Sequence, residues 1–176
     1  FAGDVVEVLK QAPSKDVAEV VATYGTARSD QRAFRLSRAI EGYSRVVLAA
    51  NVNAGLSPLG AQAELYRTHA LIQLGRLSDA ERDLEGLVAR LAPRRYAVLE
   101  SSAYQRLAWI AASRVQPAQA RDLYDRSLAM LSGRRNPGSE STLWAAAGLA
   151  DLELGRLSEA WTGVKRSLDV AATSRD

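Results

Sequence analysis

Apolar residues recur along this chain at intervals of three and four, the spacing of one face of an α-helix. Two such stretches lie on either side of a short polar break. The apolar positions of the first stretch are Leu65, Tyr66, Ala70, Leu71 and Leu74. Those of the second are Leu77, Ala80, Leu84, Leu87 and Leu91. Alternating runs that would predict strands are short throughout the chain. The pattern therefore predicts helices joined by turns, and no sheet.

Residues that end or start helices stand beside these stretches. Gly75 can take the left-handed conformation that closes a helix. Ser78, with Glu81 three residues later, predicts an N-cap with a capping box. Pro93 predicts the end of the second helix. Pro117 suits the first turn of a later helix, where its missing N–H costs nothing. These signals predict helix–turn–helix units.

The break between the helices recurs along the chain. Residues 74–80 read Leu-Gly-Arg-Leu-Ser-Asp-Ala, and residues 154–160 read Leu-Gly-Arg-Leu-Ser-Glu-Ala. Weaker copies lie at residues 35–39 and 115–120. The alanines that close the four copies are separated by 41, 40 and 40 residues. They are Ala39, Ala80, Ala120 and Ala160. This spacing predicts a structural repeat of about 40 residues.

The repeat predicts one domain over residues 1–176, built from eight or nine antiparallel helices. Four units are expected, approximately at residues 14–51, 61–93, 97–132 and 141–174, after a short opening helix at residues 1–12. In the first unit we expect a helix up to Tyr24, a polar stretch at residues 25–31 and a long helix through residues 36–50. A loop at residues 51–60 then leads into the second unit.

The register of these units resembles that of the tetratricopeptide repeat, which places an aromatic residue, a leucine, a small residue, a turn glycine and an alanine in order. In the third unit the matching residues are Tyr104, Leu107, Ala108, Ala120 and Tyr124. In the fourth they are Trp144, Gly148, Gly155 and Ala160. Val115 stands where the turn glycine belongs, and Glu64 and Arg67 depart from the pattern. The resemblance covers residues 61–170 well and residues 14–50 weakly.

This resemblance implies an all-α fold, a right-handed superhelical solenoid of stacked helix pairs. Neither helix of a unit can bury its apolar face alone, so the units must pack side by side. The period is longer than is usual in the family and is similar to repeats in large bacterial regulators and in segments attached to caspase-like proteases. Arginine far outnumbers lysine, which suggests a GC-rich bacterial genome; a cytoplasmic location is favoured.

Composition argues against several classes of function. The chain has no cysteine and one histidine, His69, which excludes thiol catalysis and every motif that needs two histidines. The net charge of +3 is small, and no helix carries a one-sided basic stripe, so we expect no nucleic-acid partner. No apolar stretch is long enough to insert into a membrane. No phosphate-binding or nucleotide-binding motif is present. We therefore expect a protein that is not an enzyme, with no catalytic residue, cofactor or metal.

In the tetratricopeptide family the first helix of each unit lines the concave side of the superhelix. The resemblance therefore implies a groove that binds a peptide or protein segment. The expected partner-binding residues are Tyr66, His69, Gln73, Arg106, Trp109, Ser113 and Glu153. In the fourth unit the same face includes Leu149 and Leu152. We expect Tyr66 beside Arg106, and His69 beside Trp109. The alternative is that Tyr66 and Trp109 only fill the core.

A second candidate surface lies on the final helix. Its apolar residues Trp161, Val164 and Leu168 have no following helix in the sequence to cover them. We expect that the natural chain continues past Asp176, or that a partner or a second copy covers this face as a homodimer. The start at Phe1 suggests a piece of a longer protein or a processed chain.

Three functions remain open at this point. The favoured one is a protein-interaction module with a rigid groove. The second is a domain of a bacterial regulator that senses a peptide or small ligand. The third is a substrate-recognition arm of an enzyme whose catalytic domain lies outside this sequence.

Overall fold

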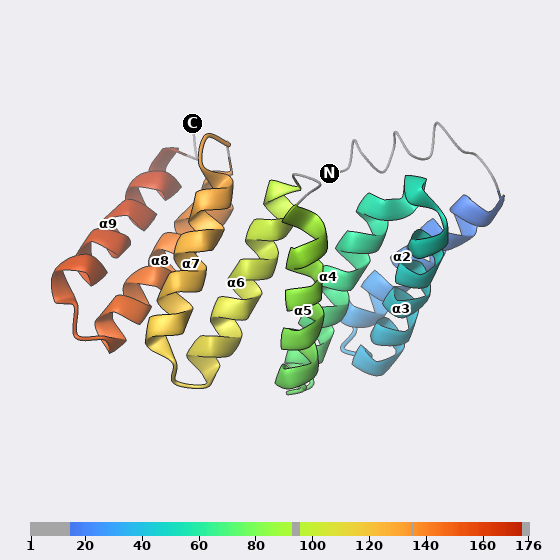
Figure 1. Cartoon of the computed structure of the whole chain (residues 1–176), viewed down its shortest axis with the longest axis horizontal. Coiled ribbons are helices and arrows are strands. Elements are labelled where there is room, and N and C mark those ends of the chain that lie inside the picture. The colour runs from blue at the N-terminus through green and yellow to red at the C-terminus, as the bar shows by residue number, and fades with distance from the viewer. Residues whose placement is uncertain (1–14, 93–95, 135, 174–176) are drawn as a thin grey trace. The chain divides into compact units, whose positions relative to one another are not determined.

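The described part of the chain is built of helices. The computed structural model describes residues 15–92, 96–134 and 136–173 (Figure 1). It contains α2 (Lys15–Arg32), α3 (Leu36–Val52), the short 3-10 helix η1 (Ala54–Leu56), α4 (Ser57–Gln73), α5 (Leu77–Leu91), α6 (Ala97–Ser113), α7 (Pro117–Leu131), α8 (Pro137–Glu153) and α9 (Leu157–Thr173). These residues include no strand, and the predicted all-α fold is confirmed. The predicted opening helix at residues 1–12 and Pro93 lie outside the described residues.

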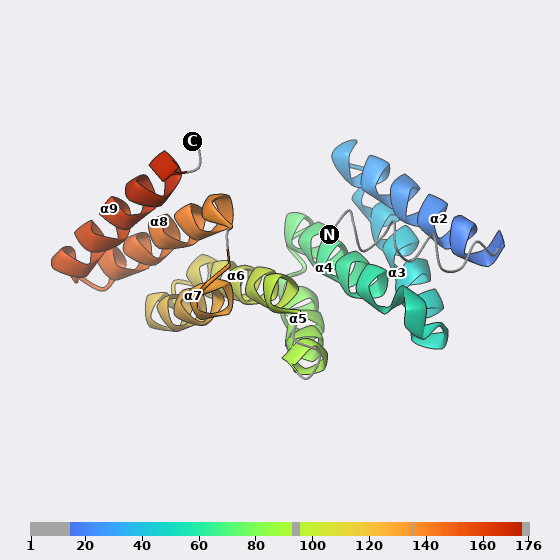
Figure 2. The same cartoon turned by 90° about the horizontal axis from the view of Figure 1, so that it is seen from above.

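The chain divides into two compact units, Phe1–Asp83 and Leu84–Asp176. In the first unit, α2 packs against α3 and α3 packs against α4. In the second unit, α6 packs against α7, α7 against α8, and α8 against α9. The helices that pack together within each unit lie side by side in Figure 2, α2 beside α3 and α8 beside α9. The single domain over residues 1–176 and the right-handed superhelix stay predictions.

Four turns between paired helices share one backbone conformation. Each has one residue with positive φ, and these residues are spaced 41, 40 and 40 positions apart. They are Phe34 (56°), Gly75 (74°), Val115 (58°) and Gly155 (73°). The next amide donates a hydrogen bond to the carbonyl five residues earlier, as in the Schellman motif. These bonds are Arg35 N to Asp30 O (2.9 Å), Arg76 N to Leu71 O (2.9 Å), Gln116 N to Ala111 O (3.0 Å) and Arg156 N to Asp151 O (2.9 Å). The repeat is therefore present in the backbone.

The four alanines that revealed the period lie in equivalent places. The amide of each donates to the carbonyl four residues earlier, which is the first hydrogen bond of the second helix. Ala39, Ala80 and Ala120 are fully buried, and Ala160 is 8% exposed. A larger side chain at any of these positions would meet the neighbouring helix. The predicted equivalence of the four alanines is confirmed.

The start of α5 differs from the prediction. The amide of Ala80 donates to the carbonyl of Arg76, so Arg76 is the N-cap and the expected N-cap, Ser78, lies one residue inside the helix. The turn after Gly75 is as short as the Schellman motif allows, which brings the helix start forward. The guanidinium of Arg76 instead pairs with Asp79, at 2.6 Å.

Two predicted breaks in the first unit are wrong. The helix expected to end at Tyr24 continues through Gly25 to Arg32. Ala27 and Gln31 are buried on its inner face, and this burial outweighs the cost of one glycine, about 1 kcal/mol. The loop expected at residues 51–60 is mostly helical, because α3 extends to Val52 and α4 begins at Ser57.

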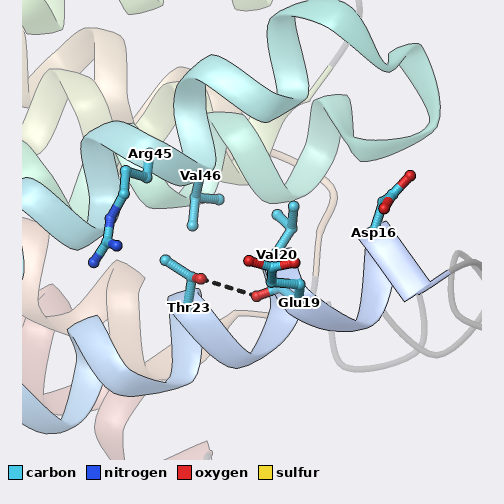
Figure 3. A pocket seen from close by; sticks show the side chains of 6 residues that line it. All are labelled: Asp16, Glu19, Val20, Thr23, Arg45 and Val46. Carbon is cyan, nitrogen blue, oxygen red and sulfur yellow. Dashed lines mark hydrogen bonds between the residues drawn. The ribbon is translucent and has the colours of Figure 1, made fainter.

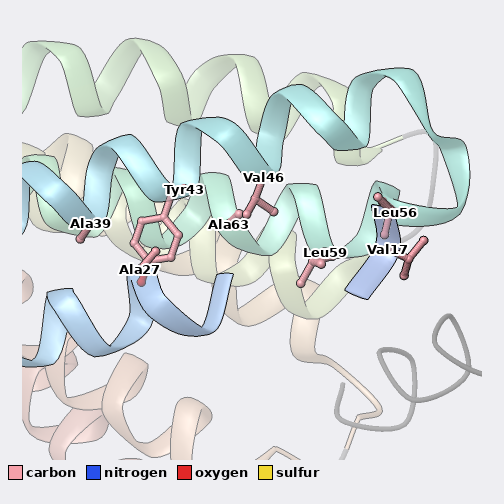
Figure 4. Close-up of a cluster of buried hydrophobic side chains, with 8 residues drawn as sticks. All are labelled: Val17, Ala27, Ala39, Tyr43, Val46, Leu56, Leu59 and Ala63. Carbon is pink, nitrogen blue, oxygen red and sulfur yellow. The ribbon is translucent and has the colours of Figure 1, made fainter. Parts of the chain in front are cut away.

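The core of the first unit is formed by α2, α3, η1 and α4 (Figure 4). Its buried apolar residues are Val17, Ala27, Ala39, Tyr43, Val46, Leu56, Leu59 and Ala63. The second unit has a core of the same kind. Its buried apolar residues are Ala108, Ala111, Ala120, Tyr124, Leu131, Leu143, Ala147 and Ala150. The many alanines allow the helices to approach closely.

Glycine lies at the crossing of α8 and α9. A Cβ on Gly163 would lie 2.9 Å from the Gly148 Cα and 3.0 Å from the Trp144 carbonyl oxygen. A Cβ on Gly148 would lie 3.0 Å from the Ala160 carbonyl oxygen. The expected small residue at this crossing, Gly148, is therefore confirmed, and Gly163 is its partner on the second helix.

Serine pairs link the two helices of the third and fourth repeats. Ser127 on α7 donates to the carbonyl of Ser101 on α6 at 2.8 Å. One period later, Ser141 on α8 and Ser167 on α9 form a matching pair, in which Ser141 donates to the carbonyl of Ser167 at 2.9 Å. Neither pair was predicted, although each serine recurs after 40 residues.

Candidate partner-binding surfaces

Tyr66 belongs to a cluster of three tyrosines in the first unit. Its ring stacks on that of Tyr43 with centroids 6.0 Å apart, and meets the ring of Tyr24 edge-on at 6.3 Å. The Arg28 guanidinium lies 3.6 Å from the centre of the Tyr66 ring, a favourable cation–π distance. Tyr66 is half-buried and stabilises the packing of α2, α3 and α4.

Gln73 is held by a chain of hydrogen bonds in the same unit. The Tyr43 hydroxyl donates to Gln31 Oε1 at 2.7 Å. Gln31 Nε2 in turn donates to Gln73 Oε1 at 3.3 Å. Burial raises the pKa of Tyr43 above its usual value of 10, although the hydrogen bond and positive charge of Arg28 oppose this effect. The phenol therefore remains a donor at neutral pH, and these hydrogen bonds hold the Gln73 side chain against α2.

His69 is exposed on α4, one turn from Tyr66 and Gln73. The sequence predicted that His69 lies beside Trp109 and Tyr66 beside Arg106. In each of these pairs the first residue belongs to the first compact unit and the second residue to the other. Their adjacency stays a prediction.

On the first helices of the second unit, three large apolar side chains of the predicted face are exposed. Trp109 on α6 is 48% exposed, and Leu149 and Leu152 on α8 are 57% and 52% exposed. Trp109 and Leu149 occupy the same position of successive repeats, 40 residues apart. We call these three residues the first-helix surface. The sequence places all three on the same predicted face and singles out Trp109 as a partner-binding residue.

Of the polar residues expected beside this surface, two form hydrogen bonds within their own helix and one is exposed at a helix end. Arg106 is half-buried and its guanidinium donates to the carbonyl of Ser102 on its own helix at 3.0 Å. The Ser113 hydroxyl donates to the carbonyl of Trp109 at 2.9 Å, also within α6. Glu153 is exposed at the end of α8. Burial is the largest cause that raises the pKa of Tyr124 on α7, and the negative charge of Glu153 raises this pKa further.

The last described helix has a second apolar surface. Leu157, Trp161 and Leu168 are 69%, 71% and 67% exposed, and Val164 is 42% exposed. We call these four residues the α9 face. The opposite side of α9 packs on α8, where the Arg166 guanidinium lies 4.5 Å from the centre of the Trp144 ring. The α9 face therefore contains the three C-terminal residues expected from the sequence, with Leu157 in addition.

A hollow of about 240 Å³ lies between α2 and α3 in the first unit (Figure 3). Its lining residues are Asp16, Glu19, Val20, Thr23, Arg45 and Val46. The Thr23 hydroxyl is already bonded to the carbonyl of Glu19 at 2.9 Å. The hollow contains no residue of the expected site.

Acidic side chains are dispersed over the described part of the chain. Among its residues, no three or more histidine, aspartate or glutamate side chains are grouped so that they could hold a metal ion. No helix in the same part of the chain has the length and apolar character needed to cross a membrane.

Comparison with known proteins supports the fold. No protein-family model matches the sequence, and no curated protein matches it. Among solved structures, BtubC (BKLC) from P. vanneervenii is similar, with a TM-score of 0.77 and 20% identity over 89% of this chain. The match spans 64% of the BtubC chain, just under two thirds. A variant of a putative kinesin light chain of Podosopora anserina, with nearly identical TPR-like repeats, has a TM-score of 0.69 and 17% identity over 97% of this chain and 84% of that one.

MamA is also similar, with a TM-score of 0.67 and 19% identity over 97% of this chain and 86% of that chain. Identities this low establish a shared fold and leave the extended-period bacterial type a prediction. The four equivalent turns, the 40-residue spacing and these neighbours agree. The chain has the fold of a tetratricopeptide-like helical repeat.

Proposed function

We propose that this chain is a protein-interaction module that binds a peptide or protein segment on its first-helix surface. The observation that carries the proposal is the exposure of Trp109 on α6 and Leu149 on α8, which occupy the same position of successive repeats, together with Leu152 on α8. Large apolar side chains in contact with water favour association, because burying them contributes about 25 cal/mol per Å². Tryptophan is also among the residues that most often dominate binding energy.

The fold supports this proposal. Stacked helix pairs present successive first helices with a fixed spacing, so one extended partner can contact several repeats. The side chains are attached to helices whose ends are fixed by Schellman turns, and a rigid surface loses little entropy on binding. Binding on this surface requires no proton or group transfer, and the proposal assigns no catalytic residue.

Polar residues next to the first-helix surface would set the orientation of a partner. Arg106 already uses one guanidinium nitrogen on its own helix, which holds its charge in a defined place. Glu153 provides the opposite charge near Leu149 and Leu152 on α8. A partner segment with an apolar centre between a basic and an acidic residue would match this arrangement.

The proposal can be tested with peptides selected against the whole chain from a random library. Their dissociation constants would be measured by fluorescence polarisation for the parent chain and for Trp109→Ala and Leu149→Ala. We expect each substitution to weaken binding at least tenfold, on the order of the effect of losing a central apolar anchor.

Trp161→Ala is the matched control, because it removes an exposed tryptophan of the same unit. We expect it to leave peptide binding unchanged. Unchanged affinity in Trp109→Ala and Leu149→Ala, with the far-ultraviolet circular dichroism of the parent, would rule out the first-helix surface. Loss of binding in Trp161→Ala alone would assign the peptide to α9 and overturn the proposal.

A further inference from the structure

A second hollow, of about 430 Å³, lies beside the turn between α2 and α3 in the first unit. We call it the Phe34 hollow. Its described lining residues are Phe34, Arg35, Leu36, Ser37, Arg38 and Leu74. Pockets that hold ligands usually measure about 300–1,000 Å³. The Phe34 hollow lies in this range, whereas the hollow of about 240 Å³ between α2 and α3 lies below it.

Two exposed apolar side chains line the Phe34 hollow. Phe34 is 77% exposed and Leu74, which follows the last residue of α4, is 43% exposed. Phe34 has a φ of 56°, a left-handed conformation that an L-residue adopts only at a cost. Residues held in such conformations cluster at ligand-binding and other functional sites. The two side chains therefore offer an apolar contact that the free chain leaves in water.

Hydrogen bonds hold the two sides of the Phe34 hollow together. Gln31 Nε2 donates to Gln73 Oε1 at 3.3 Å, which links the end of α2 to the end of α4. The amide of Phe34 donates to the carbonyl of Gln31 at 3.1 Å, and the amide of Leu74 donates to the carbonyl of Ala70 at 3.1 Å. The hollow is therefore formed before a partner binds, and a preformed site loses less free energy on binding.

The surroundings of the Phe34 hollow are positively charged. The segment from Arg28 to Arg38 contains four arginines and one aspartate. That aspartate, Asp30, is paired with Arg35, with Oδ1 2.7 Å from Nε. Arg38 is exposed, and no acidic side chain in the described part of the chain forms an ion pair with it. None of the described lining residues is acidic. An acidic partner would therefore meet attraction and little repulsion.

The apolar and basic residues together define the chemistry of the partner. An apolar side chain would enter between Phe34 and Leu74, and neighbouring carboxylates would meet Arg35 and Arg38. Guanidinium groups suit this role because their fork of donors matches a carboxylate. We propose that the Phe34 hollow is a second binding site, whose occupant is an acidic segment of a partner protein with a large apolar residue among its acidic residues.

The test uses the whole chain and fluorescein-labelled peptides, with binding followed by fluorescence polarisation. The acidic peptide has one leucine flanked on each side by aspartates. In a second peptide lysine replaces each aspartate, and in a third serine replaces the leucine. We expect the acidic peptide to bind roughly tenfold more tightly than either of the others, because it alone satisfies both the charge and the apolar contact. Added salt should weaken its binding.

Phe34→Gly separates binding from folding. Glycine occupies this turn position in the second and fourth repeats, as Gly75 and Gly155, so the substitution keeps the turn and relieves its strain. We expect the acidic peptide to bind roughly tenfold more weakly, while the free energy of unfolding does not fall. Val115→Gly is the matched control, because Val115 is an exposed apolar residue at the same turn position. It should leave peptide binding unchanged.

Arg38→Glu tests the charge. It should weaken binding of the acidic peptide and strengthen binding of the lysine peptide. Arg126→Glu, at an exposed arginine of α7, is the matched control and should change neither. The Phe34 hollow lies in the first unit and the first-helix surface in the other. Trp109→Ala should therefore leave the acidic peptide bound, which separates this inference from the proposed function.

Three results would overturn the proposal. The first is equal binding, or no binding, of the acidic and lysine peptides at low salt. The second is a Phe34→Gly variant that binds the acidic peptide as tightly as the parent chain. The third is binding of phosphatidylserine vesicles, sensitive to Phe34→Gly, in place of the peptide. That result would assign the hollow to a membrane surface.

Discussion

At the scale of the residue, two of the four equivalent turns are strained. The left-handed position is glycine in two repeats, but it is Phe34 in the first and Val115 in the third. An L-residue in this conformation costs about 1–2 kcal/mol, and a β-branched residue is among the worst suited to it. Both side chains are largely exposed, at 77% and 83%. Neither therefore gains enough burial to offset the strain.

We expect Val115→Gly to raise the free energy of unfolding by about 0.5–1 kcal/mol, since the relief of strain exceeds the entropic cost of glycine. The reverse change, Gly155→Val, should lower it by about 1 kcal/mol. A Cβ at Gly155 would meet nothing within 4 Å. The loss of stability would therefore come from the left-handed backbone conformation and not from a steric clash. Urea titration of both variants measures the effect. Equal stability of Val115→Gly and the parent would contradict the strain.

At the scale of the element, close helix crossings determine which glycines tolerate a side chain. Gly163→Ala should destabilise the chain by about 1–3 kcal/mol, because its methyl group would meet the backbone of Gly148 and Trp144 at 2.9–3.0 Å. Backbone atoms cannot rotate away as a flexible side chain can. Thermal unfolding followed by circular dichroism gives the comparison.

Gly25→Ala is the matched control for this substitution. Gly25 lies inside α2, and an added Cβ would have no atom within 4 Å. Alanine is the better helix former, so we expect a gain of about 0.5–1 kcal/mol. If both alanine variants changed stability in the same direction, the close crossing of α8 and α9 would be in doubt.

The elements also show what the sequence can reveal. The turns were predicted well because the Schellman motif depends on residues close together in the sequence, such as Leu71, Gly75 and Arg76. The continuation of α2 through Gly25 was missed because it depends on burial against α3, which no local pattern contains. Arg67 on α4, which departs from the repeat pattern, is likewise explained by a contact with a residue distant in the sequence. Its guanidinium lies 2.9 Å from the carboxylate of Asp83, sixteen residues away.

At the scale of the whole molecule, the exposed side chains were harder to predict than the fold. Tyr66 and Trp109 both fit the predicted binding face, yet Tyr66 packs with Tyr24 and Tyr43 from two other helices, whereas Trp109 remains 48% exposed. A helical pattern assigns a residue to a face of its own helix. It does not tell which neighbouring helix brings a ring or a guanidinium to that face, and this difference separates the packed Tyr66 from the exposed Trp109.

Buried tyrosines in both compact units make the stability of the molecule sensitive to alkaline pH. Burial is the largest cause that raises the pKa of Tyr24, Tyr43 and Tyr124 above 10, their usual value. The folded chain therefore holds these protons more tightly than the unfolded chain. Their contribution is fully present below pH 10 and is lost as the pH rises through the folded pKa values.

We expect the free energy of unfolding to be nearly constant from about pH 8 to the usual tyrosine pKa of 10 and to fall above it, by up to about 1.4 kcal/mol per pH unit for each phenol. Urea titrations over this range, with phenolate absorbance of the folded chain, test this. Tyr43→Phe should reduce the slope because it removes one proton from the linkage, even though it also breaks the bond to Gln31. If folded and denatured chains ionised over the same pH range, the tyrosine linkage would be refuted.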